Sequence, residues 1–356
     1  MKNSEWLAIN KMNVLIVIPY KGHRSNFSHH LSHHLNDLQK TKVTTVTPPY
    51  YSCYSKTGKM LNKKQVAAVM LFNFFFFIYH FVITKRQKYN VILLSSHVVA
   101  IPFLSLTRVL PFINARRKII VTSFFLHGLG KKKPVQRLLR YLFSSRKVLL
   151  VVQASDELEY YSQLMDKDQV IYFPFCQHEV AVSENCGKGE EYIFAGGYTN
   201  RDYECLFEAA QKVNHNFIII CSRLNRIDPE QVPCNVRILS DTNPKDFHGY
   251  MQNAEIVIIP LKEKTGSSGQ KVALAAMSFK KAIIYTNIDS VAQYFEDGVS
   301  GISYEINNAQ DLADKIRRLL SDAHLREKLG ANALKTYYER YHISKYSEFL
   351  ANLVLG

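Results

Sequence analysis

A loop rich in glycine and serine holds the residues of this chain that are best suited to bind an anion. An apolar run ends at Pro260, the segment TGSSGQK follows at 265–271, and a helix is predicted to begin near Gln270. Unpaired N–H groups at a helix N-terminus attract phosphate, and glycine lets the main chain approach it closely. An ordinary strand-to-helix turn could carry the same pattern. The predicted phosphate contacts are Gly266, Ser267, Ser268, Gly269, Gln270 and Lys271.

A second glycine loop follows the apolar run YIFAG at 192–196. Gly196 and Gly197 end the predicted strand, and Arg201 and Asp202 begin a helix. The planar guanidinium group binds two phosphate oxygens at once, so Arg201 is suited to a diphosphate lying opposite the first loop. The alternative is that Arg201 is a solvated residue at a helix start.

Histidine and aspartate supply three further candidates. His127 follows the predicted strand KIIVTSFF at its carboxyl end, where parallel sheets bind ligands, and we expect it to have a functional role. A metal site formed by His30 and His34, one helical turn apart among four clustered histidines, is disfavoured because no third ligand is evident. The Asp166–Asp168 string is not expected to bind a metal.

The elements that must position these residues alternate between strands and helices in both halves of the chain. This alternation predicts an α/β protein with two Rossmann-like, doubly wound parallel domains that face each other across a cleft. We place the domains at 1–180 and 181–340. The final segment, 341–356, is expected to be a helix that packs back on the first domain.

Length and composition agree with this architecture. The chain has 356 residues, of which 47% are hydrophobic and 21% charged, so it is neither a disordered nor a fibrous protein. Its six cysteines form no C-x-x-C pair, which favours reduced thiols inside a cell. The first apolar run is a strand-like segment with no cleavage site after it, so a signal peptide is not expected.

Positive charge is concentrated in the first half of the chain. Residues 1–180 carry a net charge of +17 and residues 181–356 carry −2, and no Asp or Glu occurs between Asp37 and Asp156. Such a surface favours an anionic partner: nucleic acid, an anionic membrane surface or a phosphorylated substrate. Nucleic acid fits poorly, because no recognised binding motif is present.

An apolar segment at 65–84 has no charged residue and is flanked by lysine and arginine. It is long enough to span a bilayer. A span would put the strand-like runs at 13–19 and 90–96, which look like parallel neighbours in one sheet, on opposite sides of the membrane. We therefore predict a buried helix or one that dips into the membrane surface.

Three segments of the second half resemble glycosyltransferase family 4. They are FAGGYTNRDYECLFEA at 194–209, the run at 257–305 that contains TGSSGQK, and the run at 311–343 that begins DLADKIRR. The resemblance is good over about residues 190 to 345 and loose over 13 to 180, where it depends on strand order and on VVQASDELEYYSQLMDKDQVIYFP. It implies the GT-B fold, with the acceptor bound by the first domain and a nucleotide sugar by the second.

The resemblance also assigns roles to residues. The Gly266–Lys271 loop would hold the donor diphosphate, Arg201 and Lys271 would neutralise it as it leaves, and His127 would lie near the transferred sugar. Transfer would proceed with retention, without a metal or other cofactor. The family usually has two glutamates eight positions apart around this loop, but Ser267 and Ala275 stand there, which leaves ribose recognition unexplained.

Taken together, these features predict a hexosyltransferase that acts on a lipid-linked or membrane-proximal glycan in the synthesis of a surface polysaccharide or glycolipid. Basic clusters beside apolar helices suit an anionic membrane surface. We expect a cytoplasmic protein bound peripherally to the inner face of the cell membrane. A non-catalytic, membrane-associated scaffold of GT-B type is the alternative, because the two glutamates are missing.

Overall fold

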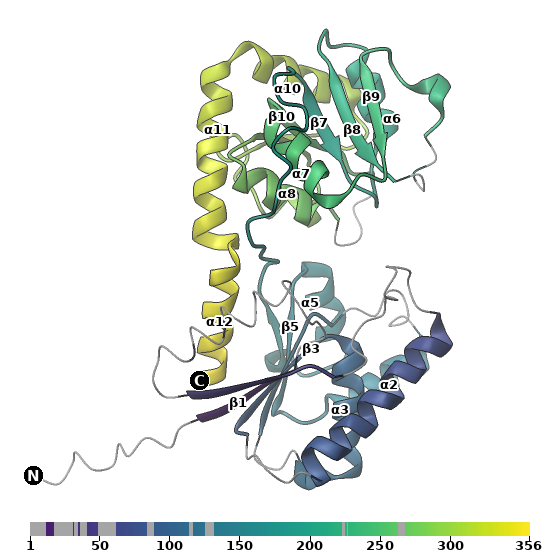
Figure 1. The fold of residues 1–356 in the computed structure, drawn as a ribbon, viewed down its shortest axis with the longest axis vertical. Coiled ribbons are helices and arrows are strands. Elements are labelled where there is room, and N and C mark those ends of the chain that lie inside the picture. Colours follow the sequence, from purple (N-terminus) through teal and green to yellow (C-terminus); the bar gives the residue numbers. More distant parts are fainter. Residues whose placement is uncertain are drawn as a thin grey trace, which may run out of the picture. The chain divides into compact units, whose positions relative to one another are not determined.

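The protein folds into two compact units, seen in a computed structural model (Figure 1). The first unit comprises Met1–Pro174 with Tyr346–Gly356, and the second comprises Phe175–Lys345. The structure describes residues 12–17, 31, 35, 41–48, 62–83, 89–113, 117–124, 132–222, 225, 227–262 and 268–356.

The first unit contains a sheet of parallel strands in the order β2-β1-β3-β4-β5-β6. The central strands have nearly continuous runs of apolar residues, as expected for a sheet covered on both faces. Their bounds are β1 Met12–Val17, β2 Thr41–Val46, β3 Val91–Ser95, β4 Lys118–Thr122, β5 Val148–Val152 and β6 Val170–Tyr172.

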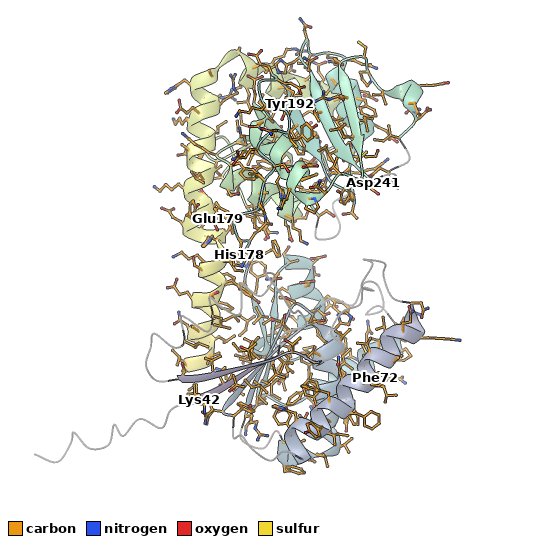
Figure 2. The ribbon with its side chains drawn as sticks, in the orientation of Figure 1. Lys42, Phe72, His178, Glu179, Tyr192 and Asp241 are labelled. Carbon is orange, nitrogen blue, oxygen red and sulfur yellow. The ribbon has the colours of Figure 1, made fainter. Side chains whose placement is uncertain are left out.

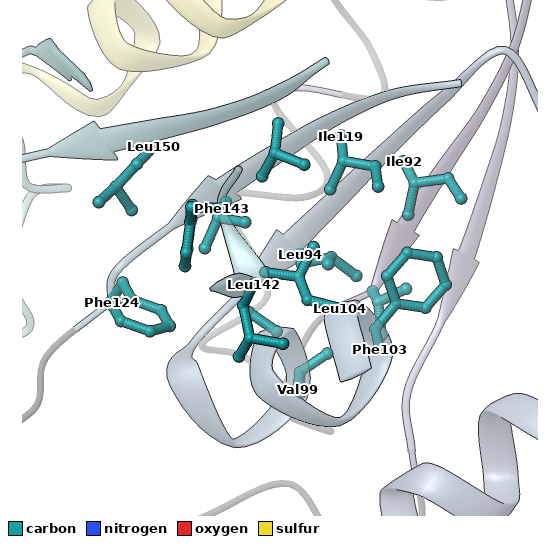
Figure 3. Packing of buried hydrophobic residues seen from close by; sticks show 14 of the residues in the cluster. Ile92, Leu94, Val99, Phe103, Leu104, Ile119, Phe124, Leu142, Phe143 and Leu150 are labelled. Carbon is teal, nitrogen blue, oxygen red and sulfur yellow. The ribbon is translucent and has the colours of Figure 1, made fainter. Parts of the chain in front are cut away.

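Helices α2, α3 and α4 pack on one face of this sheet. Alternate strand residues such as Ile92, Leu94 and Ile119 point toward Phe103 and Leu104 of α3 (Figure 3). The described helices of the unit are α2 Lys63–Ile78, which continues as the π-helix Tyr79–Ile83, α3 His97–Val109, the short 3₁₀ turn Pro111–Ile113, α4 Lys133–Leu142, α5 Ser155–Ser162 and the 3₁₀ turn Lys167–Gln169.

Helix α2 begins at a capping box. The Asn62 side chain accepts from the Gln65 amide, and the Gln65 side chain accepts from the Asn62 amide. Chain order places α2 between β2 and β3, and both strands pair with β1. Helix α2 is therefore a crossover connection, and its two ends return to the same sheet.

Helix α3 is longer than the sequence predicted. The sequence predicts a helix near 101–110, whereas α3 begins at His97 and contains Pro102 within it. Two side chains bond to main-chain groups in the first turn of α3. The Ser96 hydroxyl accepts from the Val98 amide. Asn73 donates to the Val98 carbonyl, which receives no helical hydrogen bond because Pro102 has no N–H.

The second unit contains a second parallel sheet, ordered β12-β11-β10-β7-β8-β9. Both sheets match the doubly wound class expected from the sequence. The strands are β7 Ile193–Gly196, β8 Phe217–Cys221, β9 Val236–Ser240, β10 Ile256–Ile259, β11 Ala282–Thr286 and β12 Ile302–Tyr304.

The helices of the second unit cover both faces of its sheet. The sequence predicts a helix over 203–213, whereas the helix that begins at Tyr203 ends at Ala210. The short helix at 289–292 and strand β12 were not predicted. The helices are α6 Tyr203–Ala210, the 3₁₀ turn Pro229–Gln231, α7 Pro244–Asn253, α8 Gln270–Ser278, α9 Asp289–Ala292, α10 Ala309–Ser321, α11 Ala323–Thr336, the π-helix Tyr337–Tyr341 and α12 Ile343–Leu355.

The C-terminal residues of α12 belong to the first unit. Phe349 stacks on Phe173, with ring centroids 4.3 Å apart, and Lys118 Nζ donates to the Leu353 carbonyl over 2.6 Å. The chain therefore passes between the units twice, after Pro174 and inside α12.

Candidate functional site

The carboxyl ends of β7 and β10 form the switch point of the second sheet. From β7 the chain proceeds outward to β8 and β9, and then returns to the opposite side of β7 to form β10, β11 and β12. In doubly wound sheets this reversal leaves a crevice at the carboxyl ends of the central strands, where ligands bind. Both glycine loops singled out in the sequence begin here.

Backbone hydrogen bonds join the two loops. The Asp202 amide donates to the Pro260 carbonyl over 3.1 Å, the Lys262 amide donates to the Asn200 carbonyl over 3.3 Å, and Arg201 forms a β-bridge with Leu261. The sequence suggested that Arg201 lies opposite the first loop. The structure brings Arg201 next to the strand end from which that loop departs.

The Arg201 side chain folds over its own loop. Its Nε donates to the Gly196 carbonyl over 2.9 Å, and its Nη1 donates to the Thr199 carbonyl over 2.7 Å. Burial lowers the pKa of this guanidinium, and no ion pair joins it to a carboxylate in the described part of the chain. Arg201 is therefore not the solvated residue of the alternative reading but a half-buried cation, which an anionic ligand would stabilise.

The absence of a side chain at Gly197 leaves the space that this guanidinium occupies. Its φ is +132°, and a Cβ at this position would collide with Nη2 of Arg201, so no other residue fits without displacing the arginine. The Tyr203 hydroxyl donates to the Gly197 carbonyl over 2.7 Å and holds the loop from the other side.

Helix α8 begins at the same edge, and no described side chain caps its N-terminus. Gly269 precedes it with a φ of +85°, and the first bond of the helical ladder runs from the Ala273 amide to the Gly269 carbonyl. The amides of Gln270, Lys271 and Val272 precede that ladder, and within the described residues no acceptor is bonded to them, so they could donate to an anion. Gly269 also allows close packing, because a Cβ there would lie 3.1 Å from Leu261 Cδ1. Leu261 therefore contacts both loops.

Two buried polar atoms beside Gly269 have no hydrogen-bond partner among the described residues. They are Gln270 Nε2 and Ser290 Oγ. Ser290 lies in α9, whose Val291 packs against Gly269. An oxygen-rich ligand at the start of α8 could accept from either group. Gln270, the first residue of α8, thus adds a side-chain donor to the main-chain amides of this turn.

Two residues of this edge were missed in the sequence. Thr286 ends β11, and its Oγ1 accepts from the Leu261 amide over 2.8 Å and lies 2.8 Å from the Tyr304 hydroxyl. Tyr198 lies in the β7 loop with 48% of its side chain exposed, and its carbonyl accepts from Asn225 Nδ2. Threonine at the end of a strand and tyrosine in a loop are common in protein sequences. The sequence therefore did not mark these two residues as part of a site, and only their position in the fold does.

Some predicted site residues lie outside the described part of the chain: His127, Gly266, Ser267 and the four clustered histidines. Ser268 is half-buried, and Lys271 is exposed on the first turn of α8.

Ala275, where the resemblance leads one to expect a glutamate, is buried in the core of the second unit. The exposed carboxylate of Asp289 lies in the first turn of α9, which packs on Gly269 through Val291. Asp289 is thus an acidic candidate for contact with a ligand at this edge.

The D-x-D string lies in the first unit. Asp166 faces Arg146 at 3.9 Å, and Lys167 begins a 3₁₀ turn. Within the described ranges, no three His, Cys, Asp or Glu side chains are grouped in a way that could hold a metal ion.

Residues 222–336, which run from the end of β8 through α11, match the family described as glycosyl transferases group 1. The second unit carries a glycosyltransferase group 1 domain. The β10–α8 edge described above belongs to this glycosyltransferase domain, and the β7 loop precedes it in the chain.

Two curated proteins match parts of the chain. An uncharacterized glycosyltransferase of Methanocaldococcus jannaschii is 22% identical over 146 residues, which are 39% of this chain and 41% of that protein. Alpha-D-kanosaminyltransferase of Streptomyces kanamyceticus is 29% identical over 100 residues, 28% of this chain and 25% of that protein. The matched region thus spans less than half of the length of either relative.

Solved structures resemble the fold over nearly the whole chain. Sucrose-phosphate synthase from Thermosynechococcus elongatus has a TM-score of 0.68 at 13% identity and covers 97% of this chain and 99% of its own. Anabaena HepE in complex with UDP and glucose has a TM-score of 0.62 at 12% identity and covers 96% and 99%. These neighbours are GT-B glycosyltransferases, so the two units have the fold class expected from the sequence.

Proposed function

We propose that the protein is a glycosyltransferase that moves a sugar from a nucleotide-diphosphate sugar to an acceptor bound by the first unit. The observation that carries the proposal is the half-buried Arg201 cation, which has no carboxylate partner in the described chain and belongs to the same sheet edge as the N-terminus of α8. A diphosphate would supply the missing negative charge. The complex of Anabaena HepE with UDP and glucose supports a nucleotide sugar as donor.

The residues of this site would stabilise a nucleoside diphosphate as it leaves the sugar. As the bond between the sugar C1 and the phosphate oxygen breaks, negative charge grows on that oxygen. The remaining donors of Arg201, the first amides of α8 and the exposed Lys271 would neutralise it. Charge-assisted hydrogen bonds of this kind contribute about 1.5–3 kcal/mol each. Transfer would retain the configuration of C1 and need no metal, and His127 would lie near the sugar.

Ribose recognition requires an acceptor other than the missing glutamates. Asp289 supplies a carboxylate on α9, an element that packs against the N-cap residue of α8. A carboxylate there could accept from ribose hydroxyls.

The proposed acceptor is a lipid-linked or membrane-proximal glycan, and the proposed place of action is the cytoplasmic face of the cell membrane. The charge of the first unit supports both, because residues 1–180 carry a net charge of +17 while residues 181–356 carry −2. Such an acceptor fits the synthesis of a surface polysaccharide or glycolipid.

Calorimetric titration of the purified protein with UDP, GDP and dTDP tests the donor site. We expect one nucleotide to bind and Arg201→Gln to weaken it by about tenfold to a hundredfold, the loss of one or two charge-assisted bonds. Arg318→Gln, on the exposed face of α10, is the matched control and should leave binding unchanged. If no nucleotide binds the wild-type protein, the proposal is wrong.

Transfer is then tested with the sugar conjugates of the nucleotide that binds. We expect nucleotide release that depends on a membrane lipid extract and is insensitive to EDTA. Anomeric NMR signals of the product report retention or inversion. Nucleotide binding without any release would identify the non-catalytic scaffold instead.

A further inference from the structure

The exposed apolar side chains of this protein are concentrated on one layer of helices. Twelve large apolar side chains in the described chain are exposed, and eight of them lie between residues 71 and 141. These eight belong to α2 and its π-helical continuation, the end of α3 with the turn after it, and α4, which we call the helical layer. They are Leu71, Phe72, Phe75, Tyr79, Val109, Phe112, Leu138 and Tyr141.

Helix α2 is apolar on both sides. Val69, Asn73 and Phe77, spaced by four residues, are buried against the core of the first unit. Leu71, Phe75 and Tyr79 have the same spacing on the opposite side and are exposed by 57%, 58% and 59%. Phe72 lies on the outer side of α2 as well (Figure 2). An ordinary surface helix would carry polar residues along this side.

The neighbouring helix α4 carries exposed basic side chains next to exposed apolar side chains. Lys133, Arg137 and Arg140 are exposed on it, together with Leu138 and Tyr141. Arg108 at the end of α3 stacks on Tyr141, 5.3 Å from the ring centroid, and donates to the Leu142 carbonyl over 3.0 Å. This contact joins the end of α3 to α4, so the apolar and basic side chains belong to one continuous layer.

We propose that the outer surface of the helical layer docks on an anionic lipid bilayer, with the exposed side of α2 inserted among the lipid chains. Charge complementarity favours a bilayer over a protein partner. Residues 38–155, which include the whole layer and four strands of its sheet, contain no Asp or Glu that would repel lipid phosphates. Aromatic and basic side chains side by side are the composition that membrane interfaces favour.

The helix lies in the surface and does not cross the membrane. Lys64–Phe81 is long and apolar enough for a span by length and composition, and 17% of it is buried. However, both ends of α2 lead into strands that pair with β1, so both must remain on the same side of the bilayer. Insertion of one side of the helix keeps the hydrogen bond from Asn73 to Val98 intact.

Vesicle flotation tests the docking separately from sugar transfer, because no nucleotide is present. We expect the full-length protein to float with phosphatidylcholine vesicles that contain phosphatidylglycerol, and far less with phosphatidylcholine alone. The double variant Arg137→Gln/Arg140→Gln should lower the partition constant by about 25-fold, roughly fivefold for each cation removed. Arg318→Gln/Lys328→Gln, exposed in the second unit, is the matched control.

Insertion is tested by fluorescence. In a Trp6→Phe background, which removes the single tryptophan, Phe75→Trp should shift to the blue on vesicles and be quenched by lipids brominated on their acyl chains. Tyr198→Trp, exposed in the second unit, should do neither. The triple variant Leu71→Ser/Phe72→Ser/Phe75→Ser should lose about tenfold or more in partition and keep its unfolding temperature, because these side chains are exposed.

Any one of four results would overturn the inference. The first is equal binding of the charge variants and the wild type. The second is vesicle binding without a shift or quenching of Phe75→Trp. The third is binding to duplex DNA at the same salt concentration with no flotation, which would assign the charge to nucleic acid. Resistance of the vesicle-bound protein to carbonate extraction would support a span and contradict a surface helix.

Discussion

Asn73 Nδ2 donates to the carbonyl oxygen of Val98 over 2.9 Å, and this hydrogen bond attaches α2 to α3. The Val98 carbonyl would normally accept from the residue four positions later, but that residue is Pro102, which has no N–H. Asn73 is completely buried, so its amide supplies inside the core the donor that the proline lacks.

Asn73→Leu should therefore lower the free energy of unfolding by about 1–3 kcal/mol, the cost of a buried carbonyl without a donor. In a Pro102→Ala background the introduced alanine has a main-chain amide that can reach the Val98 carbonyl, so the same substitution should cost clearly less. Urea unfolding of the four proteins gives the coupling energy. Equal costs in the two backgrounds would show that Asn73 does not act through this carbonyl.

Gly269→Ala should damage the donor site more than it damages the fold. A side chain at a φ of +85° is strained by about 1–2 kcal/mol, and the added methyl group would press on Leu261 and Ile259 at the start of α8. We expect a loss of nucleotide affinity in calorimetric titration together with a modest fall in unfolding temperature.

Gly298→Ala is the matched control for this strain. Gly298 has a φ of +73° and open space around it, so it should lose similar stability while binding nucleotide normally. Equal nucleotide affinities for the two variants would show that Gly269 serves only the turn.

Glu157 should make the first unit less stable as the pH rises. Burial raises the pKa of this carboxyl from 4.5 to about 7. In the unfolded chain it ionises near its ordinary value, so the folded protein holds an extra proton between these two values. The contribution of Glu157 to the free energy of unfolding is then greatest below pH 4.5 and decreases as the pH rises to about 7.

Glu157→Gln keeps an acceptor for the Gln153 amide and removes this titration. The variant should gain about 2–3 kcal/mol relative to the wild type between pH 4.5 and pH 7. Glu159→Gln, exposed on the same helix, is the control for removing a carboxylate. Parallel stability curves for wild type and Glu157→Gln would contradict the expectation.

Asp289→Asn should weaken nucleotide binding by roughly tenfold if this carboxylate accepts from the ribose, because a charge-assisted hydrogen bond is replaced by a neutral one. The comparison of UDP with its 2′-deoxy analogue makes the test specific: the wild type should prefer UDP, and the variant should lose the preference. Asp314→Asn, exposed on α10, is the control. An unchanged preference in Asp289→Asn would place ribose recognition elsewhere.

Local pattern predicted most elements of the fold. Short continuous apolar runs such as those of β3 and β10 are typical of buried strands in a parallel sheet, and the glycine and serine before Gln270 indicate a helix start. The start of α3 could not be predicted, since a helix that contains Pro102 depends on a donor 29 residues earlier in the chain.

By itself, the sequence determined the residue types of the candidate site, the two-domain α/β class and the concentration of positive charge in the first half, because these depend on composition and short-range spacing. Only the tertiary structure decided that Arg201 lies against Gly197 and that two of its donor groups bond to main-chain carbonyls. It also decided that Leu261 contacts both loops. Finally, it decided that one side of α2 is buried while the other side, which is equally apolar, is exposed. Those properties depend on which strands become neighbours, and strand order in a sheet is set by long-range packing that no local pattern contains.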